Sequence, residues 1–143
     1  PLREALGRLA AEGLAVVGRG RTLVVSQLDA DDVVHLFELR EALETQAARL
    51  AARRARPEVF TGLAERFAGA GALLADDDPD RTAYYALVGE LDAALDTAMA
   101  SRHLQRSLAA LRAHVARVRR LAHADTARLL RAAGEPRLIA EAV

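Results

Sequence analysis

Arginine side chains near the start of the 143-residue sequence are the first candidates for chemistry. Arg3 and Arg8 lie among apolar residues at helical spacing, and Arg19 and Arg21 alternate with glycines between two short apolar runs. A guanidinium group can pair with a phosphate or with the edge of a guanine base. The formal net charge is zero, so this local cluster, and not the global charge, predicts a nucleic-acid contact. A solvated helix arginine is the alternative for Arg3, and the lysine-free composition makes such residues common.

Three polar residues further along the chain are candidates for binding a small molecule. Asp92 lies at the edge of the apolar stripe of one predicted helix, and His114 lies at the margin of the next stripe, between Leu111 and Val118. A partly buried carboxylate needs a cation or a hydrogen-bond donor. Asp92 therefore either favours a cationic or hydroxyl-rich ligand or pairs within the bundle with Arg112. A lone histidine such as His114 is more often packed or solvated than a ligand-binding residue.

Catalytic and membrane-spanning patterns are missing from the sequence. There is no cysteine, the three serines have no partnered His/Asp pattern, and no glycine-rich phosphate loop is present. The acidic run at 76–80 lacks the alternating ligand spacing of a calcium loop and predicts a solvated turn. No apolar run is long enough to span a bilayer, and no signal peptide is present. We therefore expect a cytoplasmic protein that is not an enzyme and has no membrane partner.

Two differently patterned segments must position these residues. The first 25 residues predict a helix that ends at Gly13, followed by a β-hairpin with a basic tip at 18–21. Residues 28–143 predict an all-α, antiparallel bundle, because successive helices have short connections. Its helices are expected at about 29–54, from Pro57 to the acidic run, at 79–100, at 102–123, around Leu129 and Leu130, and at 137–143.

Local signals refine the first two helices of this bundle. Asp29 is placed to cap the first helix, and Arg40 and Glu44 lie one turn apart and can pair. Gly69 and Gly71 weaken the end of the second helix. The predicted apolar stripe of the first helix comprises Val33, Leu36, Leu39, Leu43, Ala47 and Leu50.

The amino-acid sequences of the two segments resemble those of the GntR family of bacterial transcription regulators. PLREALGRLAAEGL followed by GRGRTLVV resembles the recognition helix and wing of a winged helix-turn-helix, and LDADDVVHLFELREALETQAARLAARRA resembles the opening helix of the FadR-type effector (FCD) domain. The resemblance implies part of a DNA-binding domain at 1–27 and an effector-binding, dimerisation domain at 28–143. It also implies that Arg3 contacts a base edge or a phosphate, and that Arg19 and Arg21 contact the backbone or the minor groove.

The same resemblance implies a metal site whose ligands this sequence lacks. Many FadR-type effector domains hold a metal with one Asp and three His. Aligned with that pattern, Val88 stands at the position of the Asp, while Asp92 and Pro136 stand at positions of His. The last His would lie beyond Val143. Valine and proline side chains cannot bind a metal, so we expect no resident metal and no other cofactor.

The resemblance implies an effector-responsive transcriptional regulator that binds operator DNA as a homodimer and senses a small molecule in its bundle. A winged helix needs two helices before the recognition helix, so the sequence is interpreted as truncated at its N-terminus, and also at its C-terminus. The alternative interpretation is a helical dimerisation or interaction module with no DNA-binding or metal-binding activity of its own.

Overall fold

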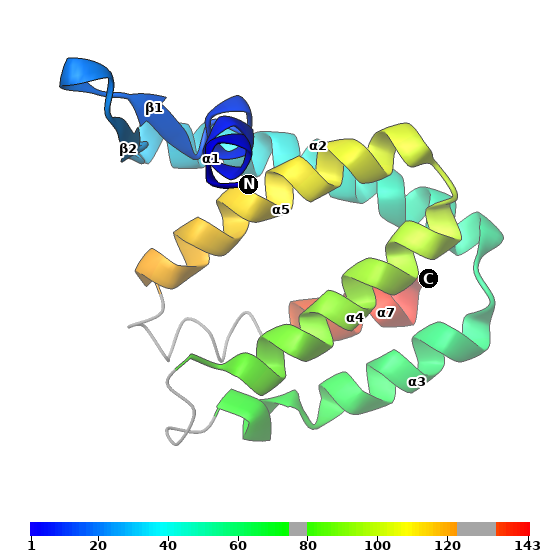
Figure 1. The fold of residues 1–143 in the computed structure, drawn as a ribbon. Helices are drawn as coiled ribbons and strands as arrows, with labels where there is room; N and C mark the ends of the chain where they lie inside the picture. Colours follow the sequence, from blue (N-terminus) through cyan, green and yellow to red (C-terminus); the bar gives the residue numbers. More distant parts are fainter. Residues whose placement is uncertain (75–79, 123–133) are drawn as a thin grey trace.

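The computed structural model describes residues 1–74, 80–122 and 134–143, without the side chains of Arg21, Leu121 and Ala122. The acidic run and the helix expected around Leu129 and Leu130 fall wholly or largely outside these ranges. No helix within them is both long and apolar enough to cross a membrane. Figure 1 shows a helix–hairpin unit beside one end of a set of long helices.

The N-terminal unit consists of α1 (Leu2–Ala11), β1 (Ala15–Val17), η1 (Arg19–Arg21) and β2 (Leu23–Val25). The strands pair antiparallel, with Ala15 opposite Val25. Gly13 and Gly20 both have φ of +73°, a conformation in which a side chain would be strained. The predicted helix and hairpin are therefore confirmed. No residue of α1 is buried, so its apolar face stays exposed.

The bundle contains α2 (Ala30–Arg54), α3 (Pro57–Ala68), η2 (Ala70–Leu74), α4 (Thr82–Met99), α5 (Arg102–Ala122) and α7 (Glu135–Ala142). The Asp29 carboxylate accepts a hydrogen bond of 2.7 Å from the Asp32 amide, which confirms the predicted cap of α2. α3 ends at Ala68 with Gly69 as its C-cap, and the chain continues as η2, so the glycines interrupt this helix as expected. α4 begins at Thr82, three residues after the predicted start at Pro79.

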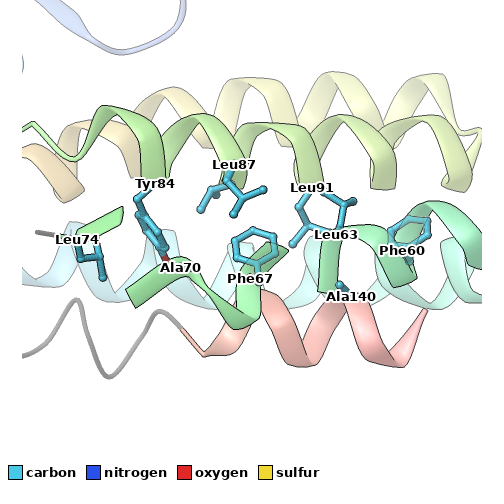
Figure 2. Packing of buried hydrophobic residues seen from close by; sticks show 10 residues of the cluster. Phe60, Leu63, Phe67, Ala70, Leu74, Tyr84, Leu87, Leu91 and Ala140 are labelled. Carbon is cyan, nitrogen blue, oxygen red and sulfur yellow. The ribbon is translucent and has the colours of Figure 1, made fainter. Parts of the chain in front are cut away.

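Two apolar clusters hold the bundle together. The first joins α3, η2, α4 and α7 and includes Phe60, Phe67 and Leu91 (Figure 2). The second joins α2, the end of α4 and α5 around Met99 and Leu108, neither of which is exposed. α4 packs against both α2 and α3, so it is the central helix of the bundle.

The prediction that Leu39 belongs to the core is wrong, since its side chain is 51% exposed. Consecutive residues of an α-helix are rotated by about 100°. On α2 this places Leu39 and Arg40 at opposite edges of the stripe that contains Leu43 and Ala47. The buried face of α2 is centred toward Arg40 and Ala51, and Leu39 therefore faces away from it.

Candidate functional site

A cavity of about 800 Å³ lies between α2, α4, α5 and α7. Its volume falls in the range of small-molecule pockets, about 300–1,000 Å³. The apolar part of its wall comes from Val88, Leu91, Leu95, Leu108 and Ile139. A mainly apolar wall with a few polar groups is the usual construction of a small-molecule site. The polar groups of this wall therefore define the candidate site.

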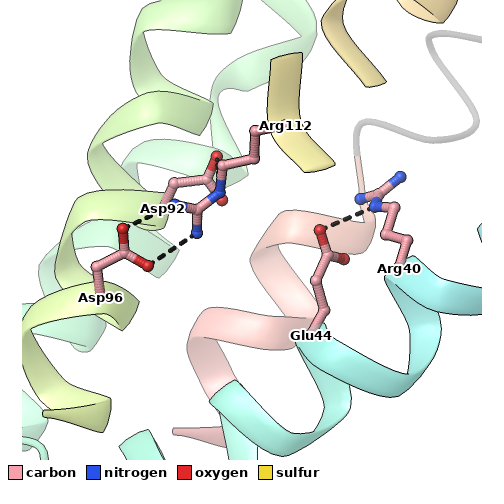
Figure 3. Close-up of polar contacts among 5 residues, drawn as sticks. All are labelled: Arg40, Glu44, Asp92, Asp96 and Arg112. Carbon is pink, nitrogen blue, oxygen red and sulfur yellow. Dashed lines mark hydrogen bonds and ion pairs between the residues drawn. The ribbon is translucent and has the colours of Figure 1, made fainter. Parts of the chain in front are cut away.

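The first polar group is an arginine shared by two aspartates of α4 (Figure 3). Arg112 of α5 donates hydrogen bonds of 2.7 and 3.0 Å to the two carboxylate oxygens of Asp96. Its Nε lies 3.3 Å from Oδ2 of Asp92, an ion pair whose geometry does not make a hydrogen bond. Asp92 and Arg112 both line the cavity. Of the two alternatives expected for Asp92, a bound ligand or a pair within the bundle, the structure shows the pair with Arg112.

The charges of this group perturb one another. Burial alone would lower the pKa of Arg112, but the hydrogen bonds to Asp96 and the charges of Asp92, Asp96 and Glu44 together raise it. Arg112 therefore stays charged. For Asp92, burial raises the pKa of the carboxyl above its ordinary value, and Arg112 offsets only part of this effect. The charges of Glu44 and Asp96 also raise this pKa, while the charge of Arg119 lowers it.

The raised pKa of Asp92 predicts a pH-dependent contribution to stability. From about pH 4, the ordinary pKa of aspartate, up to the raised pKa, the folded chain binds more protons at Asp92 than the unfolded chain. The contribution of Asp92 to stability therefore falls as the pH rises through this window. Asp92→Asn should remove that fall, so urea unfolding should show the variant gaining stability relative to wild type between pH 4 and pH 7.

Glu38→Gln is the control for this measurement, since Glu38 is an exposed carboxylate on α2. We expect its effect on stability to be the same at both pH values. A relative stability of Asp92→Asn that is flat with pH, or that falls from pH 4 to pH 7, would contradict the assignment.

The second polar group of the wall is on α2 (Figure 3). Arg40 Nε lies 2.8 Å from Glu44 Oε1, which confirms the predicted pair one turn apart. The Arg40 guanidinium also lies 5.4 Å from the centre of the Phe37 ring, within the range of a cation–π contact. All three residues line the cavity.

Tyr85 and Arg119 also belong to the polar wall, a role that no sequence pattern indicates. The buried Tyr85 hydroxyl has no hydrogen-bond partner among the described residues. The Arg119 guanidinium lies 5.7 Å from the centre of the Tyr85 ring. Burying an unpaired hydroxyl is costly, so Tyr85 is a group that a bound ligand can satisfy. The sequence gives only a weak signal that Tyr85 lines a cavity. Tyr85 neighbours the predicted core residue Tyr84, and adjacent residues of a helix point in different directions.

His114 does not occupy the predicted position. It is not among the residues that line the cavity, and its Nε2 lies 2.8 Å from the carbonyl oxygen of Glu12, at the end of α1. The reason is helical geometry, since two residues correspond to a rotation of about 200°. Arg112 and His114 therefore point in opposite directions from α5. The expectation that His114 faces the cavity is corrected accordingly.

The three positions aligned with metal ligands of the FadR-type pattern all line this cavity. They carry Val88, Asp92 and Pro136, of which only Asp92 has a side chain that can bind a metal. Within residues 1–74, 80–122 and 134–143, no three His, Asp or Glu side chains form a group that could hold a metal ion. The described residues of this cavity therefore do not fit a metal. We predict that elemental analysis of the purified protein finds far less than one zinc, manganese or nickel ion per chain; near-stoichiometric metal would contradict this.

The predicted DNA-binding residues lie on the N-terminal unit, and none of them is among the residues that line the cavity. Arg3 is exposed on α1, and Arg19 is exposed in η1 at the tip of the hairpin. The backbone of Arg21 closes η1, while its side chain lies outside the described part of the chain. The role of these arginines stays a prediction.

The fold and the cavity define an all-α bundle domain with a partly open cavity of small-molecule size between its helices, preceded by a basic helix–hairpin unit. Residues 35–143 match the family model described as the FCD domain, and the chain belongs to this family. The chain is also similar to the Nta operon transcriptional regulator of Aminobacter aminovorans, with 44% identity over 55 residues. This segment is 38% of the chain and 26% of that regulator. The family and this likeness support a regulatory role.

Proposed function

We propose that the chain functions in an effector-responsive transcriptional regulator of the GntR family, in its FadR-type branch. In this proposal, two copies bind operator DNA as a homodimer in the cytoplasm, and a small molecule occupies the bundle cavity. The observation that carries this proposal is the FCD match directly preceded by a basic helix–hairpin unit. The name of the similar regulator of Aminobacter aminovorans supports the same role. In this proposal the regulator has no enzymatic activity.

The proposed effector is a cationic or hydroxyl-rich small molecule that binds without a metal. Asp92 and Asp96 share one guanidinium group, that of Arg112, so this group of three carries a net negative charge when both carboxyls are ionised. Asp92 has no hydrogen bond to Arg112, and the buried Tyr85 hydroxyl has no partner in the described chain. An amine or a hydroxyl of the ligand can donate to Asp92, and a second polar group of the same ligand can bond to the Tyr85 hydroxyl two turns away on α4, which satisfies both groups.

The proposed DNA contacts divide into specific and nonspecific ones. We assign a base-edge contact to Arg3, near the N-terminus of α1, because recognition helices contact the major groove with their N-terminal residues. Arg19 and Arg21, at the hairpin tip, contribute affinity through phosphates or the minor groove. Arg8 is also exposed but lies in the last turn of α1, and we assign it no DNA contact.

A gel-shift titration with the complete product of the gene, at two salt concentrations, tests this proposal. Arg3→Ala should cost about 1–3 kcal/mol of binding free energy and relax sequence preference, whereas Arg19→Ala should reduce the slope of the salt dependence by about one for each phosphate that the arginine neutralises. Arg8→Ala is the matched control, because it removes an arginine from the same helix, and it should bind as wild type does.

The alternative is a helical dimerisation module without DNA-binding activity. The exposed apolar side chains of α1 and the hairpin, such as Leu2, Val17 and Val25, are the observation that favours it. The two functions give different results in the same experiment. A complete protein that dimerises but shows no salt-dependent shift of operator DNA, and no difference between Arg3→Ala and Arg8→Ala, would replace the regulator proposal with this alternative.

A further inference from the structure

One helix, α5, contacts both the cavity and the N-terminal unit. Arg112 and Arg119, seven residues apart on the same face, line the cavity. His114 and Arg117, three residues apart on another face, contact the N-terminal unit. Side chains at these spacings share one face of a helix. The two sets of contacts thus lie on different faces of the same two turns of α5.

The contacts of His114 and Arg117 fall at the base of the hairpin. His114 Nε2 lies 2.8 Å from the carbonyl oxygen of Glu12, and its ring is close to Gly13, where a Cβ would lie 3.7 Å from Cε1. Arg117 donates a hydrogen bond of 2.7 Å to the Ser26 hydroxyl and also donates to the Ser26 carbonyl oxygen. The Ser26 amide in turn donates a hydrogen bond of 3.1 Å to the carbonyl of Leu14. α5 therefore binds the segments that enter and leave the hairpin.

The opposite face of α5 is anchored by charge. Arg112 joins α5 to α4 through two hydrogen bonds to Asp96 and the ion pair with Asp92. A ligand that binds Asp92 or competes for Arg112 changes this attachment directly. Arg112 and Arg117 are five residues apart on one continuous helix, about 7.5 Å along its axis at 1.5 Å per residue. A displacement at Arg112 is therefore carried to Arg117 without an intervening loop.

We propose that α5 couples the cavity to the hairpin, with Arg112 as the contact on the cavity side and His114 and Arg117 as positioning residues for the hairpin base. When the Arg112–aspartate attachment is weakened, α5 shifts relative to α4 and the hairpin base loosens or moves. The biological meaning of this coupling rests on the proposed function. The coupling itself is a property of the 143-residue chain and can be measured without DNA or effector.

The test is amide hydrogen exchange of the 143-residue chain, followed at Gly18 and Ser26, whose amides close hydrogen bonds within the hairpin. Arg112→Gln removes the charge that pairs with the aspartates, and Asp96→Asn breaks the same attachment from α4. Each should speed exchange at these two amides about fivefold, the factor that corresponds to about 1 kcal/mol. Arg106→Gln is the matched control, an exposed arginine of α5 outside the cavity lining, and should leave exchange unchanged.

A double His114→Ala, Arg117→Ala background separates coupling from general loosening. In that background the hairpin amides should already exchange fast, and adding Arg112→Gln should produce no further increase. Two results would overturn the proposal: unchanged hairpin exchange in both Arg112→Gln and Asp96→Asn, or an equal increase with and without the His114 and Arg117 contacts. Each would reject the coupling while leaving the regulator proposal to the gel-shift experiment.

Discussion

Replacing Phe60 with alanine is expected to lower the free energy of unfolding by about 3–5 kcal/mol, the usual cost of removing a buried phenylalanine side chain. Phe60 is only 2% exposed and belongs to the cluster that joins α3, η2, α4 and α7. Its loss leaves a space that helices on both sides cannot fill without moving. Urea unfolding followed by circular dichroism measures the change.

Val59→Ala is the matched control for this substitution, because Val59 precedes Phe60 on the same helix and is 43% exposed. Its cost should be much smaller, since little apolar area leaves the interior. Equal costs for the two substitutions would mean that α3 does not bury the face that contains Phe60.

Replacing Arg112 with methionine should have the second large effect, a loss of about 2 kcal/mol of stability at neutral pH. Removing one partner of a fully buried ion pair costs about 3–5 kcal/mol; the expected loss is smaller because the Arg112 side chain remains 24% exposed. Asp92 and Asp96 are left facing each other without their shared cation. The loss should shrink as the pH falls, because protonation relieves their repulsion, and denaturant unfolding at several pH values follows it.

Arg137→Met provides the comparison for Arg112→Met. Arg137 pairs with Glu141 at 2.7 Å on α7, and both side chains are well exposed. An exposed pair of this kind contributes little to stability. The Arg112 prediction fails if both variants lose the same stability, or if restoring neutrality with Asp92→Asn and Asp96→Asn does not recover part of the loss in the Arg112→Met chain.

Elements with strong local signals are predictable from this sequence. Asp29 caps α2, and Gly13 ends the turn that follows α1, because a capping carboxylate and a residue with positive φ depend mainly on nearby backbone. The hairpin follows from two short apolar runs around a glycine-containing turn. The pair Arg40–Glu44 follows from helical spacing alone. Each signal lies within a few residues of the feature that it predicts.

Features that depend on packing between distant helices are less predictable. The stripe on α2 includes Leu39 by periodicity, but the buried residues of this helix, Ala47 and Ala51, lie on a face rotated away from Leu39. His114 lies at the margin of its stripe, and the packing of α5 on the other helices turns the face of Arg112, and not that of His114, toward the cavity. Tyr85 and Arg119 form part of the cavity wall because α4 and α5 approach each other, which no local pattern encodes.

The contact between α5 and the hairpin base also has a consequence for the order of folding. His114 and Glu12 are 102 residues apart in the chain, and Arg117 and Ser26 are 91 residues apart. Closing loops of this length is costly until intervening structure brings the ends together. The helix–hairpin unit should therefore dock after the bundle has formed, so that weakening this contact accelerates unfolding and leaves the refolding rate nearly unchanged.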